Sequence, residues 1–442
     1  MKVLFNNKHS GCEDNILEAF LKPYEVKTNK ILEIAGNFKK SLSLGLNGQG
    51  PLMMLPSYIG KPCGNERGTY IALDIGGTNI RAARITLDHK QIFYEAEVTT
   101  SFKNPELLID YSTNRTTAEE LYDYIAEIIS TIIKKEEKYF LGFTFSFPVK
   151  QENILNATLI RWVKEIDVTG AVGEDPSKLL LDALLRKKLN IRPAAMINDT
   201  VGTFLHAAWI EKETDIASIV GTGHNTCYLQ ENHELTGKPM IVNMESANFN
   251  IGLPYTQIDK ALDENSSFPG TAQLEKMVSG VYLGELVRRI LLDLNDHGLR
   301  LKGKIFKKNI NHPYSLEARD ISEFLCDSKN ITDFFSCTNS EAEMINNICQ
   351  LIVKRSARLV AATYIGTVLH IDERLDKKHV IAIDGSVYEK MPYFREEVSS
   401  TIKEVLGEKS DHIKAVLVKG GSGAGAAIAA AIAVNSSFTV SR

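Results

Sequence analysis

A tight turn that could hold phosphate groups follows an apolar segment near residue 70. It consists of Asp74, Gly76, Gly77, Thr78, Asn79 and Arg81. Paired glycines let backbone N–H groups approach phosphate oxygens closely, and the Thr and Asn side chains can add hydrogen bonds. Asp74 can hold Mg²⁺ through water. A plain hairpin would explain the glycines alone, but the complete Asp-x-Gly-Gly-Thr-Asn-x-Arg string favours phosphate binding. No Gly-Lys-Ser/Thr of a Walker motif follows it.

A second turn of the same design occurs at Gly221, Thr222 and Gly223, again directly after an apolar segment. One Gly-Thr-Gly sequence is weak evidence by itself. A nucleotide held between two domains, however, needs one phosphate-binding turn from each of them. The pair of turns therefore predicts two related α/β domains that face a cleft.

An acid that could act as a general base, Asp199, follows Asn198 at the end of another apolar segment. Phosphoryl transfer requires mainly positioning and charge neutralisation, together with a base for the attacking hydroxyl. Taken alone, Asn-Asp-Thr before an apolar run is more simply an Asx turn or a helix N-cap. Both interpretations place Asp199 at the end of a strand.

Further strings carry polar groups that suit a sugar. Ser146 and Phe147 end an aromatic segment, and Lys164 ends a Trp-Val-Lys string. Glu245 and Glu275 are carboxylates, and each can accept hydrogen bonds from two sugar hydroxyls. The simpler explanations are a buried aromatic strand, a surface lysine and two solvated glutamates.

Two glycine-rich segments near the end of the chain could approach a flat base or a ribose closely. They contain Gly385 and Ser386, and Gly421, Ser422 and Gly423. The alternative is a tight junction between a strand and a helix, which needs glycine for the same steric reason.

The elements that must position these residues alternate between strands and helices, which argues for an α/β fold. The Lys/Asn-rich stretch 295–313 is expected to be a surface loop. Strands are expected at 69–77, 83–87, 139–149, 194–199, 217–223, 225–229, 380–384 and 415–418. Helices are expected at 14–48, 117–137, 179–189, 272–295 and 341–370, and in the Ala-rich segment after residue 420.

The composition argues against several classes of function. The 442 residues include 51 Lys and Arg against 55 Asp and Glu, so the net charge of −4 gives no electrostatic footprint for nucleic acid or an acidic membrane. Six scattered cysteines without a C-x-x-C pair argue against a zinc site and fit a reducing compartment. No apolar run reaches the roughly 18 residues of a membrane-spanning helix, and no signal peptide is recognisable. We therefore expect a cytoplasmic protein.

Taken together and in this order, the strings resemble the eukaryotic-type hexokinases from about residue 50 to residue 434. The most similar stretches are MLPSYIG, LDIGGTNIRAARI, LGFTFSFPV, INDTVGT, EKMVSGVYLGELVR, DGSVY and GSGAGAA. The resemblance implies a two-domain α/β fold of the actin and heat-shock ATPase type, with an interdomain cleft. The small domain would cover 68–197, and the large domain would cover 1–67 and 198–442. The last residues of the chain could belong to the small domain instead.

The resemblance also implies a reaction, namely transfer of the γ-phosphoryl group of ATP to the 6-hydroxyl of glucose, with mannose or fructose as alternatives. Asp199 would be the base, and Lys164 and Arg81 would be the other catalytic residues. The hexose would contact Ser146, Phe147, Lys164, Asn198, Asp199, Asn225, Glu245 and Glu275. ATP would contact Asp74 (through Mg²⁺ and water), Gly76, Gly77, Thr78, Asn79, Arg81, Gly221, Thr222, Gly223, Gly385, Ser386, Gly421, Ser422 and Gly423, with Ser422 and its glycines beside the adenosine.

Some positions depart from the family pattern. Val163 stands where a Thr usually precedes the Lys, Ala272 stands where Gln is usual, and Gly420 and Gly421 replace an acidic pair. These departures bear on sugar preference and nucleotide affinity, and not on the type of reaction.

Two other classes of protein remain open. An actin-like ATPase that serves as a chaperone or filament would not need the sugar strings. A hexokinase-like sugar sensor without catalysis would be expected to lose the base or a phosphate turn. The expected partners are a hexose and ATP, without nucleic acid or membrane, and the chain is expected to be a monomer or a homodimer.

Overall fold

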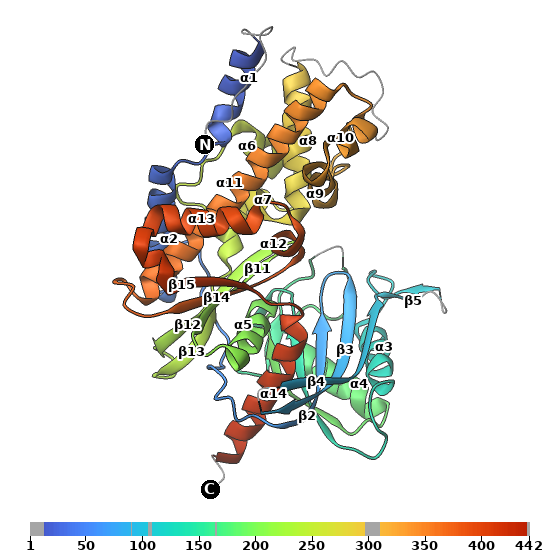
Figure 1. Ribbon diagram of the computed structural model, residues 1–442. Coiled ribbons are helices and arrows are strands. Elements are labelled where there is room, and N and C mark those ends of the chain that lie inside the picture. Colours follow the sequence, from blue (N-terminus) through green and yellow to red (C-terminus); the bar gives the residue numbers. More distant parts are fainter. Residues whose placement is uncertain (1–12, 90, 105–107, 164–165, 297–309, 440–442) are drawn as a thin grey trace.

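The computed structural model describes residues 13–89, 91–104, 108–163, 166–296 and 310–439 (Figure 1). Two mixed β-sheets dominate the architecture, and helices cover them on both sides. This confirms the α/β fold that the alternation of apolar segments predicts.

The first sheet is five-stranded, with the order β10-β7-β2-β3-β4. β2, β3 and β4 form two successive antiparallel hairpins, whereas β7 runs parallel to β2 and β10 runs parallel to β7. Its strands are β2 (Gly68–Ile75), β3 (Asn79–Asp88), β4 (Gln91–Ser101), β7 (Tyr139–Phe145) and β10 (Ile191–Ile197).

The second sheet is six-stranded, with the order β1-β13-β12-β11-β14-β15. Apart from β1, its order and strand directions repeat those of the first sheet: two antiparallel hairpins, then two parallel strands. The similarity between the two glycine turns is therefore one part of a repeat of the whole sheet. The strands are β1 (Leu55–Pro56), β11 (Thr214–Val220), β12 (His224–His233), β13 (Lys238–Asn243), β14 (His379–Asp384) and β15 (Ile413–Leu417).

The helices form layers around the two sheets (Figure 1). α3 (Ala118–Ser130) and α4 (Pro176–Arg186) cover the outer face of the five-stranded sheet. α5 (Asp199–Ile210) and α14 (Gly421–Thr439) lie between the two sheets, where they pack against each other. The remaining helices pack on the outer side of the six-stranded sheet or beyond it.

These remaining helices include the longest one, α11. They are α1 (Glu13–Leu21), α2 (Thr28–Leu46), α6 (Gln257–Glu264), α7 (Gln273–Val278), α8 (Gly280–Asp296), α9 (Ala318–Cys326), α10 (Ser328–Phe335), α11 (Asn339–Ile371), α12 (Ser386–Lys390) and α13 (Phe394–Leu406). Short 3₁₀ helices are η1 (Lys22–Tyr24), η2 (Ser246–Asn248) and η3 (Gly407–His412), and short strands are β5 (Lys103–Asn104), β6 (Ile109–Asp110), β8 (Val149–Gln151) and β9 (Ala157–Leu159). No described helix combines the length and the apolar character that crossing a membrane requires.

Three of the expected helices differ from the observed ones. The helix expected at 14–48 is two helices, because Pro23 lies in a 3₁₀ turn between α1 and α2. The helix expected at 117–137 begins with a Thr117–Glu120 capping box but ends at Ser130. The helix expected at 272–295 breaks at Ser279, and most of the expected loop 295–313 lies outside the described residues.

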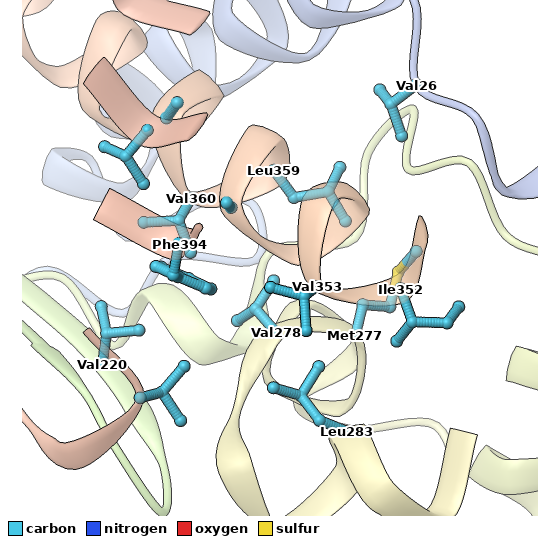
Figure 2. Packing of buried hydrophobic residues seen from close by; sticks show 14 of the residues in the cluster. Val26, Val220, Met277, Val278, Leu283, Ile352, Val353, Leu359, Val360 and Phe394 are labelled. Carbon is cyan, nitrogen blue, oxygen red and sulfur yellow. The ribbon is translucent and has the colours of Figure 1, made fainter. Parts of the chain in front are cut away.

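The largest apolar core lies around α11 on the outer side of the six-stranded sheet. Figure 2 shows side chains of α11, among them Ile352, Val353 and Leu359, together with Val278 and Leu283 from the segment of α7 and α8. This core fixes α7 and α8, which carry one side of the candidate site described below.

Close approach of α14 to its neighbours depends on glycine. A Cβ atom on Gly142 of β7 would lie 1.7 Å from the Ala426 carbonyl oxygen, and one on Gly425 would lie 2.0 Å from the Gly202 oxygen of α5. Neither distance is possible for a real side chain, so α14 rests directly on the backbone of both elements. The last helix of the chain thus packs on the five-stranded sheet.

Candidate active site

The residues with candidate functions gather at the carboxyl ends of the parallel strands. Asp74 lies in β2, Ser146 follows β7 and Asp199 follows β10 in the first sheet, whereas Gly221 follows β11 and Gly385 follows β14 in the second. In open α/β sheets, ligands bind at this edge. The repeated topology therefore brings two sets of loops to equivalent positions.

The first glycine turn is the β2–β3 hairpin, as expected. The Gly76 N–H donates to the Asn79 carbonyl oxygen over 3.1 Å, which closes the turn. A Cβ on Gly76 would meet no described atom nearer than 3.8 Å, so space lies in front of this backbone. That is the space which a phosphate oxygen needs when it approaches a turn.

The start of α14 is joined to this first turn. The Ser422 hydroxyl donates to Asp74 Oδ2 over 2.6 Å, and the Thr144 hydroxyl donates to the Ser422 carbonyl oxygen over 2.9 Å. The sequence places Ser422 beside the adenosine only by resemblance and does not predict its bond to Asp74. A Cβ on Gly423, the next residue, would meet no atom of the described chain within 4 Å, so the helix start also faces open space.

The second glycine turn is braced by α8. The Gly221 N–H donates to the Gly223 oxygen over 3.0 Å, and the Gly280 N–H donates to the Gly221 oxygen over 2.7 Å. Thr222 itself is exposed, and its carbonyl oxygen accepts from the Val281 N–H over 3.2 Å. The break before α8 thus frees the first N–H groups of this helix to hold the turn.

Asp384, at the end of β14, connects the remaining glycine segments. Its Oδ1 accepts from the Gly385 N–H over 2.7 Å and its Oδ2 from the Gly421 N–H over 3.1 Å. Burial raises the pKa of Asp384, and the charge of Asp199 adds to that effect. Sequence reasoning singled out the Asp-Gly-Ser string but assigned Asp384 no role. The signal in the sequence was an acid directly before a glycine. In the structure Gly385 has a φ of 121°, a conformation that favours glycine.

Arg81 lies opposite Asp74 in the β2–β3 register, and its ion-pair partner is Glu97 of β4, with the nearest N–O distance at 3.5 Å. The side chains of Arg81 and Glu97 are 40% and 43% exposed, so solvent screens this pair and it is weak. Thr78 lies in the turn and Asn79 begins β3, beside Arg81.

Asp199 is the first residue of α5, and Asn198 caps this helix. Asn198 Oδ1 accepts from the Thr200 N–H over 2.9 Å and from its hydroxyl over 2.7 Å. Asp199 Oδ1 also accepts from the Thr200 N–H, over 2.8 Å. The capping interpretation is therefore confirmed, and it also holds the Asp199 carboxylate in place at the positive end of a helix.

Glu245 lies in a network of asparagine side chains. Its Oε1 accepts from Asn243 Nδ2 over 2.8 Å and from Asn225 Nδ2 over 3.2 Å. Burial raises the pKa of Glu245, and the charges of Asp199 and Glu275 raise it further against these hydrogen bonds. Glu245 has a φ of 51°, so its backbone is left-handed. Two asparagines thus fix one oxygen of a carboxylate that has acidic neighbours.

Glu275, at the start of α7, reaches the second glycine turn. Its Oε2 accepts from the His224 N–H over 2.9 Å, and a Cβ on Gly223 would lie 2.9 Å from the same oxygen. Burial lowers the pKa of His224 to about 4, so this imidazole is neutral near pH 7. Glu275 therefore connects the carboxylate cluster (Asp199, Glu245 and Glu275) to a candidate phosphate turn.

Two residues of the expected sugar site are not placed as contacts. Phe147 is 5% exposed, and its ring packs edge-on against Trp162, so the ring belongs to the core. Lys164 lies outside the described residues. Ser146 follows β7, and its N–H donates to the Ile75 oxygen over 3.3 Å, which places it beside the first turn.

Lys276, next to Glu275, has a structural role. This buried ammonium group bonds to Asp263 and donates to the Phe268 carbonyl oxygen over 2.7 Å. Asp263 in turn accepts from the Gly270 N–H over 3.0 Å. The loop between α6 and α7 is thereby attached to the element that carries Glu275. Among the described residues, no group of three or more His, Cys, Asp or Glu is arranged to hold a metal ion.

Comparison with known proteins gives a consistent result over nearly the whole chain. Two hexokinase family models match residues 16–209 and 215–432. Hexokinase-1 of Spinacia oleracea is 35% identical over 91% of this chain and 87% of its own length. Hexokinase-1 of Saccharomyces cerevisiae is 34% identical over 92% of this chain and 90% of its own length.

Solved structures agree with these relatives. A hexokinase crystal structure superimposes with a TM-score of 0.83 at 28% identity, over 96% of this chain and all of that one (100%). A Schistosoma mansoni hexokinase complexed with glucose superimposes with a TM-score of 0.80 at 30% identity, over 95% of this chain and 98% of that one. The two-domain fold of the actin and heat-shock ATPase type is therefore confirmed, and the chain belongs to the hexokinase family of enzymes, which phosphorylate hexoses with ATP.

Proposed function

We propose that this enzyme transfers the γ-phosphoryl group of ATP to the 6-hydroxyl of glucose, with mannose and fructose as alternative substrates. The observation that carries this proposal is the bond from the His224 N–H to Glu275. It attaches a carboxylate suited to sugar hydroxyls to a glycine turn suited to phosphate. A sugar and a nucleotide bound to these two groups would lie next to each other.

Asp199 is the general base in this proposal. Its position at the start of α5 is fixed by the Thr200 N–H, and Asn198 already caps the helix. One carboxylate oxygen therefore remains to accept the proton of the attacking hydroxyl as the phosphoryl group is transferred. A base placed in this way contributes about 10²–10⁴-fold to the rate.

The hexose contacts in this proposal are Glu245, Glu275, Asn225, Asn198 and Ser146, with Lys164 and the Phe147 backbone as further members. Glu245 is the best defined of these residues. Both asparagine amides bond its Oε1, so Oε2 is the oxygen positioned for a sugar hydroxyl. A charge-assisted hydrogen bond of this kind is worth about 1.5–3 kcal/mol.

ATP would bind between the two glycine turns. Gly76 and Gly423 both have open space in front of their backbone, as close approach by phosphate or ribose requires. The contacts in this proposal are Asp74, Gly76, Gly77, Thr78, Asn79, Arg81, Gly221, Thr222, Gly223, Gly385, Ser386, Gly421, Ser422 and Gly423. Mg²⁺, when bound through water to Asp74, would neutralise phosphate charge.

We extend the proposal to the setting of the enzyme. It would work in the cytoplasm as a monomer or a homodimer and catalyse the first step of glycolysis. We divide the chain into two domains, each built on one sheet. The small domain is 68–197 with α14 added, and the large domain consists of the remaining residues. A fluorescent fusion tests the compartment, since one relative from Oryza sativa is described as chloroplastic.

The direct test is a coupled assay of ADP formation with glucose, mannose, fructose, galactose and glucosamine. Rapid ADP formation with glucose, and little without any sugar, would support the proposal. ADP formation that does not depend on sugar would indicate an ATPase instead. Glucose binding without ADP formation would indicate a sugar sensor.

A further inference from the structure

Arg161 and Phe268 make a direct contact between the two halves of the chain. The guanidinium carbon of Arg161 lies 5.2 Å from the centre of the Phe268 ring. Arg161 comes two residues after β9, in a segment that packs with the five-stranded sheet. Phe268 lies between α6 and α7, which pack with the six-stranded sheet. A cation over an aromatic face within about 6 Å is attractive.

Hydrogen bonds hold the backbone of the loop that carries Phe268. The Phe268 carbonyl oxygen accepts from the buried Lys276 ammonium over 2.7 Å and from the Thr271 hydroxyl over 2.9 Å. Lys276 directly follows Glu275 in α7. The Phe268 ring is 47% exposed, although it is large and apolar. A fixed loop thus presents an aromatic ring outward, next to the element that carries a proposed hexose contact.

The segment that carries Arg161 is fixed on both sides. The Ile160 N–H donates to the Pro148 oxygen over 3.0 Å, and the Trp162 indole N–H donates to the Val168 oxygen over 3.0 Å. The Trp162 ring packs against Phe147, with ring centres 5.0 Å apart. Arg161 is thereby attached to the Ser146–Pro148 segment, which carries the proposed hexose contacts of the other half.

We propose that Arg161 and Phe268 form a latch that holds the two halves together around the bound hexose and slows its release. This inference rests on the proposed function, because it takes Ser146 and Glu275 as contacts of the hexose from opposite halves. Arg161 and Phe268 are positioning residues, since they act through the segments that they join. Because both are exposed, the contact is weak enough to open in every catalytic cycle.

The expected effect is a faster loss of hexose without damage to the chemical step. At exposed sites a cation–π contact is worth about 0.5–1 kcal/mol, which is a change of about two- to fivefold. Arg161→Ala and Phe268→Ala should each raise the glucose dissociation constant and dissociation rate by this factor. The maximal rate at saturating glucose should not fall.

The experiment is stopped-flow fluorescence of the full chain with glucose. Trp162 and Trp209 are its two tryptophans, and Trp162 adjoins the latch. The double variant Arg161→Ala/Phe268→Ala should match the single variants, since both remove one contact. Phe268→Tyr keeps the aromatic face and should behave like the wild type, whereas Phe268→Leu should resemble Phe268→Ala.

Phe93→Ala is a matched control, because Phe93 is also 47% exposed but lies in β4. It should leave glucose release unchanged. Two results would overturn the latch. In the first, the increases in glucose dissociation rate of the two alanine variants multiply in the double variant. In the second, Phe268→Leu releases glucose at the wild-type rate.

Failure of the latch can be told apart from failure of the proposed function. If the wild type phosphorylates glucose but all variants release it at the same rate, only the latch is wrong. If the wild type binds none of the five hexoses, the proposed function is wrong, and a latch around a bound hexose is wrong with it.

Discussion

Replacing Glu245 by Gln should change sugar affinity and protein stability in opposite directions. Burial, together with the charges of Asp199 and Glu275, raises the pKa of this carboxyl above its ordinary value of 4.5. The folded state therefore binds a proton more readily than the unfolded chain does, so the ionised group destabilises the sugar-free protein near pH 7. Glutamine removes this charge, and its carbonyl oxygen can still accept from the Asn243 and Asn225 amides.

The loss of affinity follows from the same geometry. A hydroxyl that donates to a charged Oε2 contributes about 1.5–3 kcal/mol, and the amide nitrogen of glutamine cannot accept that bond. The glucose dissociation constant of Glu245→Gln should therefore rise about 10- to 150-fold, since 1.36 kcal/mol is tenfold. Its melting temperature without sugar should also rise.

The pH dependence gives an independent check. In the wild type, glucose affinity should fall as the pH falls through the raised pKa of Glu245, because protonation removes the acceptor charge. Glu245→Gln should lose this dependence. Titration calorimetry between about pH 5 and 8 measures affinity, and calorimetric melting measures stability. Glu264→Gln, at an exposed acid, is the control. An unchanged affinity, or a lower melting temperature, in Glu245→Gln would refute the reasoning.

Three further predictions concern catalysis, stability and closure. Asp199→Asn keeps an acceptor for the Thr200 N–H but loses the proposed base. Single-turnover rates should therefore fall about 10²–10⁴-fold, while calorimetry should find little change in glucose affinity. A near-normal rate would exclude Asp199 as the base. Although burial opposes it, the Asp215 and Asp372 carboxylates hold the pKa of His379 above its ordinary value of 6.5. The stability from this group is therefore fully present below pH 6.5 and is lost as the pH rises through the folded-state pKa. The wild type should melt at a higher temperature than His379→Gln, and this difference should shrink as the pH rises from about 6 to about 9. A difference that stays constant over this range would contradict the raised pKa of His379. Finally, saturating glucose should compact the protein in small-angle scattering, because we expect the site to close around the sugar and exclude water. An unchanged radius of gyration would count against closure.

The sequence predicted most strands well, because buried parallel strands are continuous apolar runs. β4 was missed for the opposite reason. It is an edge strand whose side chains are largely exposed, so its polar residues give no such signal. The repeat was visible only as two similar turns, since the order of strands depends on pairings between segments that are far apart in the chain.

The candidate site was predictable where chemistry depends on residue type, as in the two glycine turns and the acids Asp199, Glu245 and Glu275. It was not predictable where a role depends on contacts over long sequence distances. Asp384 connects Gly385 with Gly421, and the break at Ser279 lets Gly280 hold Gly221, but neither relation leaves a local pattern. The aromatic string around Phe147 was ambiguous by itself, and burial decides that its ring belongs to the core.

The packing of α14 on the first sheet has a consequence for folding during synthesis. The face of this sheet that carries Tyr70, Ala72, Ala83 and Ile85 belongs to the core that α14 completes. The sheet is fully synthesised at Ile197, but α14 begins only at Gly421. At about 5–20 residues per second, the ribosome needs roughly 10–45 s to add these residues. Throughout that interval the apolar face lacks its final cover, and an apolar surface exposed in this way is prone to aggregation.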